Sequence, residues 1–327
     1  GVWSAVASSS GLFGPVVGGL LVGGLGWRWI FFLYIPFGVV AIVLVALWVP
    51  KFPAGVSRID PVSALLSLVA VLAIVLTLQQ GPELGWPLWL FGVLLLGITA
   101  LVVFILLQRR AQRLGQDALV PMELFRIRNF RWGSLSVSTL GFAVYSMNLP
   151  IMLYLQLSAG LSAQLAGLLL LPQAIVSVVM APILGRLTDR LPPGRISKIG
   201  FGSMMTSMAL FAILMAAEVP VGWLLIPLVF QGAANAMCWS ANSAISMRGL
   251  PGHLVGAGSG VYNTSRQVGA VIGAAALGAV MQISLLHTGF AQAMGLSLVL
   301  QVVVLGLGFA AVSRFRTEKQ HPAADDA

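Results

Sequence analysis

Amide, thiol and aromatic side chains recur at helical spacing inside apolar segments of this chain. In the block at 222–247, Gln231, Asn235, Cys238 and Asn242 stand at offsets of 0, 4, 7 and 11, and Trp239 borders them. Residues at these offsets share one face of a helix. Such a face can bind an amphipathic organic molecule, because amides form hydrogen bonds and aromatic rings hold cations or flat rings. We therefore predict that this stripe lines a substrate cavity.

Two further stripes are candidates for the same cavity. The block at 130–154 carries hydroxyl, aromatic and amide residues on one helical face, among them Tyr145 and Asn148. The block at 162–184 adds Gln173 beside Pro172. Polar groups inside a membrane can instead form hydrogen bonds between helices, each worth roughly 0.6 kcal/mol on average. For any single residue, this structural role is the alternative to a place in the cavity.

The charged residues are informative mainly by their positions. All nine carboxylates fall in connections, near block ends or in the tail, and they are Asp60, Glu83, Asp117, Glu123, Asp189, Glu218, Glu318, Asp325 and Asp326. A proton relay inside a membrane normally needs an embedded acid or histidine. We therefore expect that these residues alone do not couple transport to protons.

Arg266 is the one charge with a candidate position inside the membrane. The 19 residues from Val268 to Leu286 are long enough to cross a bilayer, so we expect Arg266 to lie at the inner interface with its side chain extended toward water. The alternative is a charge switch, in which Arg266 pairs with an acid or an anionic substrate in one conformation.

Enzyme chemistry finds little support in the sequence. A single cysteine, Cys238, excludes an intrachain disulfide and a cysteine-based metal cluster. The sequence contains no H-E-x-x-H motif, no paired carboxylates and no nucleophile elbow. We therefore expect neither an enzyme nor a bound metal or cofactor.

The elements that position these residues are long apolar helices. Only 8% of the 327 residues are charged and 58% are hydrophobic, whereas a soluble domain is about one quarter charged. Ten blocks without Asp or Glu are each long enough to cross a membrane, at 1–24, 30–48, 62–80, 88–108, 130–154, 162–184, 196–217, 222–247, 254–286 and 291–313. We predict an all-α, polytopic integral membrane protein with about ten transmembrane helices.

The basic residues orient these helices. Sixteen of the 18 Lys and Arg residues fall in alternate connections or in the tail, so the net charge of +9 indicates the cytoplasmic face and not nucleic-acid binding. The chain end at 327 is then cytoplasmic. Because Gly1 lies inside an apolar run without an initiating Met, we expect an earlier part of the protein to precede it.

Glycine and proline spacing in the first block carries a family resemblance. Gly14-Pro15 and Gly18-Gly19 form a flat helix face for close packing, and Trp27-Arg28-Trp29 follows. The stretch resembles the antiporter motif of the major facilitator superfamily, closest to its 14-helix drug:proton antiporter branch. Ser10 replaces one glycine of that motif, a change from one small residue to another.

Two later segments strengthen the resemblance. Gly185, Asp189 and Arg190, followed by Arg195, are similar to the cytoplasmic gating loop of the superfamily, lengthened here by Pro192-Pro193. A carboxylate between arginines can join helix ends by charge-assisted hydrogen bonds, and a solvated basic turn is the alternative. The segment 256–278 resembles the penultimate helix of the branch and includes Asn263-Thr264-Ser265-Arg266-Gln267. Its six glycines are expected to allow close helix contact, and they are Gly256, Gly258, Gly260, Gly269, Gly273 and Gly278.

The resemblance implies a domain organisation. Residues 1–50 would be the last two helices of an N-terminal six-helix bundle, with the first four helices missing. Residues 51–129 would be two central linker helices and a basic cytoplasmic loop, 130–313 the C-terminal six-helix bundle, and 314–327 a cytoplasmic tail.

The resemblance also implies a function. The protein would export hydrophobic or cationic organic compounds across a bacterial inner membrane by proton antiport and alternating access, with its coupling acid in the missing helices. Its partners would be the bilayer, a small organic substrate and protons. The open alternatives are a transporter of this superfamily for another small solute, and a membrane scaffold or receptor without transport activity.

Overall fold

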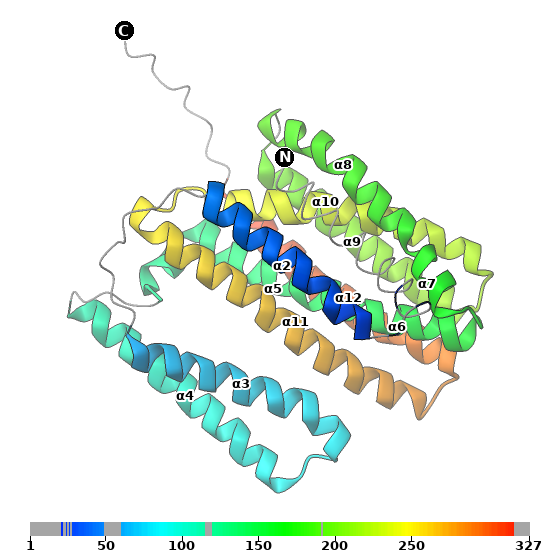
Figure 1. Cartoon of the computed structure of the whole chain (residues 1–327), viewed down its shortest axis with the longest axis horizontal. Helices are drawn as coiled ribbons and strands as arrows, with labels where there is room; N and C mark the ends of the chain where they lie inside the picture. The colour runs from blue at the N-terminus through cyan, green and yellow to red at the C-terminus, as the bar shows by residue number, and fades with distance from the viewer. Residues whose placement is uncertain are drawn as a thin grey trace.

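The chain folds into helices and short helical turns. The computed structural model describes residues 28–48, 60–114, 120–190 and 192–316, with single positions between 21 and 26. Within these ranges there is no strand (Figure 1). Nine helical segments of the described chain are long and apolar enough to cross a membrane. The predicted all-α membrane fold is therefore confirmed.

The limits of these nine segments agree closely with the predicted blocks. They run over 28–48, 61–81, 88–113, 128–158, 163–184, 194–216, 221–247, 252–285 and 290–313. The block at 1–24 lies outside the described residues. Agreement is close because the membrane thickness sets the length of each apolar segment, and charged or turn residues mark its ends.

Six long helices pack into one bundle. They are α5 (Arg128–Ser146), α8 (Leu171–Arg190), α9 (Pro193–Ala216), α10 (Leu225–Met247), α11 (Val255–Leu285) and α12 (Phe290–Ser313). Helix α5 touches α10, α11 and α12, and α9 packs between α10 and α12. Leu140, Phe201, Met204 and Phe211 are fully buried where these helices meet. The bundle thus has a continuous apolar interior.

Three helices precede this bundle. Helix α2 (Arg28–Trp48) has no buried residue among its 21. Helices α3 (Pro61–Leu84) and α4 (Leu88–Arg113) form a hairpin that lies along α11, as Figure 1 shows. Their exposed leucines and valines are suited to a lipid environment. The hairpin is thus a separate element beside the bundle, as expected for the linker helices, although the limits of the four predicted domains stay a prediction.

A chain of hydrogen bonds ties the hairpin to the segment that leads into the bundle. Asp60 caps α3 by accepting from the backbone N–H groups of Val62 and Ser63. The Ser63 hydroxyl donates to Asp60 and accepts from Gln108 Nε2 at 2.8 Å. Gln108 Oε1 in turn accepts from the backbone N–H of Val120 at 3.1 Å. Ser63 and Gln108 are buried, so this is a fixed connection.

We expect this cap to be sensitive to acid. The hydrogen bond from the Ser63 hydroxyl is the main cause that lowers the pKa of Asp60, and backbone N–H groups add to it. A lowered pKa in the folded state stabilises the cap above about pH 4 and ceases to do so as the pH falls through the folded value. Backbone amide exchange in the first turn of α3 should therefore accelerate on acidification. Asp60→Asn should keep the cap and lose the pH dependence, and an unchanged acid response in this variant would refute the assignment.

The structure corrects three expectations about continuity. The segment at 130–154 is broken, because α5 ends at Ser146 and is followed by α6 (Asn148–Leu153) and a π-helical turn, η2 (Tyr154–Ser158). The segment at 162–184 is divided into α7 (Ala163–Leu169) and α8 at Leu170. The predicted loop at 185–190 is helical, since α8 continues to Arg190 and Pro193 already begins α9. Proline is favoured in the first turn of a helix, so Pro193 shortens the connection that it was expected to lengthen.

Candidate functional site

Helix α10 presents two kinds of environment along its polar stripe. Gln231, Cys238 and Asn242 are completely buried between helices. Asn235 and Trp239, four residues apart on one face, are only partly buried. Of the five predicted cavity residues on α10, these two are therefore the ones that are not fully buried. The assignment of the other three to a cavity stays a prediction.

Asn242 joins three helices by its side chain. Its Oδ1 accepts from the Ser136 hydroxyl of α5 at 2.8 Å, and its Nδ2 donates to the Tyr262 hydroxyl of α11 at 2.9 Å. Tyr262 is 6% exposed and Ser136 is fully buried. Asn242 therefore bridges helices, which is the structural role that the sequence left open as the alternative to a place in the cavity. Ser136 and Tyr262 were not predicted, since neither stands out in its segment.

Two buried glutamines contact the residues at the interruption between α5 and α6. Gln231 Nε2 of α10 lies 3.1 Å from the Met147 sulfur, and Gln301 Nε2 of α12 donates to the Ser146 hydroxyl at 3.1 Å. The Oε1 atoms of both glutamines are buried without a hydrogen-bond partner in the described chain. Gln301 could have been noticed in the sequence as the one amide in the middle of the last apolar block.

The predicted polar stripe at 130–154 packs against α11 over one part of its length and is exposed over another. Ser138 Oγ donates to the backbone oxygen of Ser265 on α11 at 2.9 Å, so the part of the stripe around Ser138 faces α11. Tyr145 is 51% exposed and Asn148 is also exposed. Gln173 is partly buried on α8, and its backbone oxygen lies against Gly232 of α10. Tyr145 and Asn148 are thus accessible, whereas Gln173 lies at a helix contact.

Arg266 lies inside the protein and next to Trp239. Its Cζ atom is 5.8 Å from the centre of the Trp239 ring, within range of a cation–π interaction. Its Nε atom is buried and has no hydrogen-bond partner among the described residues. A side chain extended toward water would be solvated, so this geometry favours the second of the two alternatives predicted for Arg266. The Trp239–Arg266 pair, together with Asn235, is hereafter the candidate site.

A glycine seam holds α11 directly against α5. A Cβ atom on Gly269 would lie 1.9 Å from the backbone oxygen of Ser138, and one on Gly141 would lie 2.1 Å from the backbone oxygen of Arg266. Gly273 likewise faces Phe142. The predicted close contact is confirmed at Gly269 and Gly273. Gly256, Gly260 and Gly278 have no such neighbour in the described chain, so close contact at these positions stays a prediction. The seam fixes the backbone from which the Arg266 side chain extends.

The remaining predicted site residues lie elsewhere. The antiporter motif residues Gly14, Pro15, Gly18 and Gly19 are outside the described residues. Gly185, Asp189 and Arg190 belong to the end of the α8 backbone, and Arg195 is exposed in the first turn of α9. Their proposed role in gating therefore stays a prediction.

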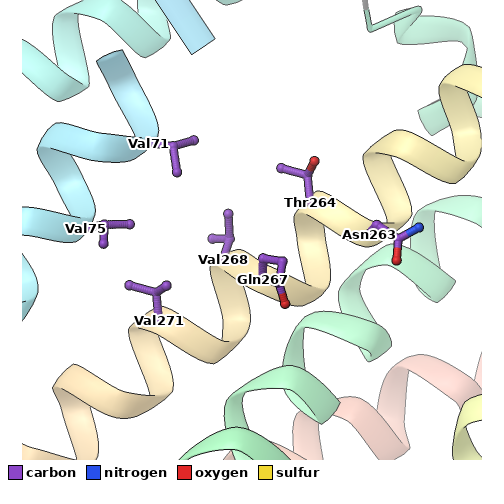
Figure 2. A pocket seen from close by; sticks show the side chains of 7 residues that line it. All are labelled: Val71, Val75, Asn263, Thr264, Gln267, Val268 and Val271. Atoms are coloured by element: carbon purple, nitrogen blue, oxygen red, sulfur yellow. The ribbon is translucent and has the colours of Figure 1, made fainter. Parts of the chain in front are cut away.

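A shallow groove of about 230 Å³ runs between the hairpin and the bundle. Figure 2 shows Val71 and Val75 of α3 facing Val268 and Val271 of α11 across it, with three polar residues of α11 completing the lining, namely Asn263, Thr264 and Gln267. None of the predicted cavity residues lines this groove. It is therefore a feature of the hairpin contact and separate from the candidate site.

The nine apolar helical segments and the polar face inside their bundle define a multi-pass membrane protein of the transporter type. The family model of the Major Facilitator Superfamily matches residues 1–274, and the chain belongs to this superfamily.

Similar proteins include an uncharacterized transporter of this superfamily from Mycobacterium tuberculosis, which is 38% identical over 86% of this chain and 48% of its own length. The multidrug resistance protein Stp of the same species is 29% identical over 86% of this chain and 52% of its own length. The methylenomycin A resistance protein of Streptomyces coelicolor is 29% identical over 90% of this chain and 63% of its own length. The chain thus spans about half to two thirds of each relative.

Proposed function

We propose that this protein exports hydrophobic or cationic organic compounds by proton antiport and alternating access. The observation that carries the proposal is the partly exposed pair Asn235 and Trp239, on one face of a helix that crosses the membrane within a major facilitator bundle. Transporters bind their substrates near the bilayer midplane on such faces. Relatives named as multidrug resistance proteins support an organic substrate.

The topology belongs to the same proposal. We place the chain in the 14-helix branch, with four further helices before residue 1, the end at 327 in the cytoplasm and the bacterial inner membrane as its location. None of the nine described spans contains Asp or Glu. A coupling acid in the preceding helices would supply the proton step, and the partners are then the bilayer, protons and a small organic substrate.

The transport proposal is tested in proteoliposomes that contain the full-length protein. A pH gradient should drive efflux of a lipophilic dye, and Trp239→Ala and Asn235→Leu should each slow it. We expect at least about a 5-fold loss for Trp239→Ala, which corresponds to about 1 kcal/mol of aromatic contact. Trp223→Ala is the matched control, because Trp223 is 57% exposed near an end of its span.

The outcomes separate the two parts of the proposal. Efflux that is unchanged in both α10 variants would refute the cavity assignment and leave transport standing. Absence of dye movement in either direction, with or without a pH gradient, would refute drug transport and favour a different solute or a scaffold.

A further inference from the structure

Arg266 is a partly buried charge well inside the longest described helix, α11. Helix α11 has 31 residues and is therefore about 46 Å long, whereas the hydrocarbon core of a bilayer is about 30 Å thick. Arg266 follows Val255, the first residue of α11, by eleven positions, which places it about 16 Å along the helix. If the core is centred on the helix, Arg266 lies about 8 Å inside its nearer boundary.

No acid in the described part of the chain is placed to neutralise this charge. The carboxylates whose side chains the structure describes, Asp60, Glu123 and Glu218, all lie outside the nine spans. The other basic residues of the nine spans lie within about one or two turns of an end. Arg266 is thus an isolated cation at a depth where charges are costly and normally functional.

The groups around Arg266 define what could complete the site. The Trp239 ring offers an apolar surface beside the guanidinium. The Asn235 Oδ1 atom, one turn along α10, is also buried without a hydrogen-bond partner in the described chain. A guanidinium binds a carboxylate through two parallel N–H donors, and its unpartnered Nε is one of these donors. The Arg266 guanidinium and the Trp239 ring therefore match a molecule that joins a carboxylate to a flat ring.

We infer that the candidate site binds the carboxylate of an aromatic organic acid, with Arg266 Nε as a donor and Trp239 against the ring. The inference rests on the proposed transport function and narrows its substrate class. At this position the positive charge favours hydrophobic acids and disfavours cations. The carboxylate would supply the counter-charge that the described spans lack.

The test measures binding to the purified full-length protein in phosphatidylcholine nanodiscs. Three probes share one ring and differ in the head group, namely pyrenebutyrate, pyrenebutanol and pyrenebutyl-trimethylammonium. Energy transfer from tryptophan to pyrene gives the saturable binding, with empty nanodiscs as background. We expect pyrenebutyrate to bind about 10-fold more tightly than the alcohol, as hydrogen bonds to charged groups allow. The ammonium probe should bind most weakly.

Arg266→Gln should abolish the preference for pyrenebutyrate, and Arg266→Lys should retain part of it as a check that the protein still folds. Arg109→Gln is the matched control, since Arg109 is exposed near the end of a span. Equal binding of the three probes, or a preference that survives Arg266→Gln, would overturn the inference.

Two further experiments distinguish this inference from lipid binding and from the proposed transport function. If nanodiscs of phosphatidylglycerol abolish the preference, the site belongs to lipid head groups and the inference fails. Carboxylate-selective binding without any proton-driven efflux would support this site and refute the proposed function. Efflux of the ammonium probe without a preference for the carboxylate would refute this site and support the proposed function.

Discussion

Gly269→Ala is expected to destabilise the protein by about 3 kcal/mol, although alanine is the better helix former. The added Cβ would lie 1.9 Å from the Ser138 backbone oxygen, and a backbone atom cannot move aside without moving α5. Separation of α5 from α11 would also break the hydrogen bond from Ser138 to Ser265. We expect the melting temperature in detergent to fall by roughly 6–12 °C, as measured by fluorescence-detected size exclusion.

Gly278→Ala is the internal control on the same helix. No atom lies within 4 Å of the position of its added Cβ in the described chain. Helix propensity alone then applies, and the variant should be neutral or slightly more stable. Equal melting temperatures for the two variants would show that the α5–α11 seam is looser than described.

Asn242→Leu is expected to lower the stability by about 2 kcal/mol. Leucine fills a similar volume, so the loss comes from the hydrogen bonds to Ser136 and Tyr262. The Tyr262 hydroxyl oxygen would lose the Asn242 Nδ2 donor in an apolar interior, which is the costlier half of the change. The expected result is a lower melting temperature with unchanged oligomer size.

A double-mutant cycle with Tyr262→Phe isolates the bridge. If the two side chains act through one hydrogen bond, Asn242→Leu should cost less in the Tyr262→Phe background than alone. Strict additivity would mean that the bond from Asn242 Nδ2 contributes nothing to stability. Ser240→Ala serves as the control, because its hydroxyl bonds the backbone oxygen of Ala236 on the same helix and not the Asn242 side chain.

The spans could be predicted from the sequence, and their breaks could not. An apolar block of about 20 residues is required by the bilayer, so its ends follow from composition. The break after Ser146 depends on Pro150, which lacks a backbone N–H, and on Gln231 and Gln301 from helices that are distant in the sequence. Membrane helices tolerate proline when neighbours satisfy the freed groups, so the residue type alone does not decide.

Periodicity located the candidate site only in part. The helical period correctly groups the polar residues of α10 on adjoining faces of that helix. It does not show which other helix packs against each face. Asn242 meets α5 and α11, whereas Trp239 remains partly open. Arg266 was assigned to the interface because the apolar residues that follow it suffice to cross a bilayer. The helix is longer than the bilayer is thick, and a bilayer centred on the helix would put Arg266 deeper.

The α5–α11 seam has a consequence for biosynthesis. Ser138 and Ser265 are 127 residues apart, and α5 lies in the least hydrophobic of the nine described spans, with a mean hydropathy of 1.3. At about 5–20 residues per second, the ribosome needs about 6–25 s to deliver the partner of Ser138. During this interval the serines of α5 lack their native neighbours on α11. A nascent chain arrested before α11 should therefore be retained by the insertion machinery or degraded. Helix α11 thus completes the packing of α5, which is synthesised long before it.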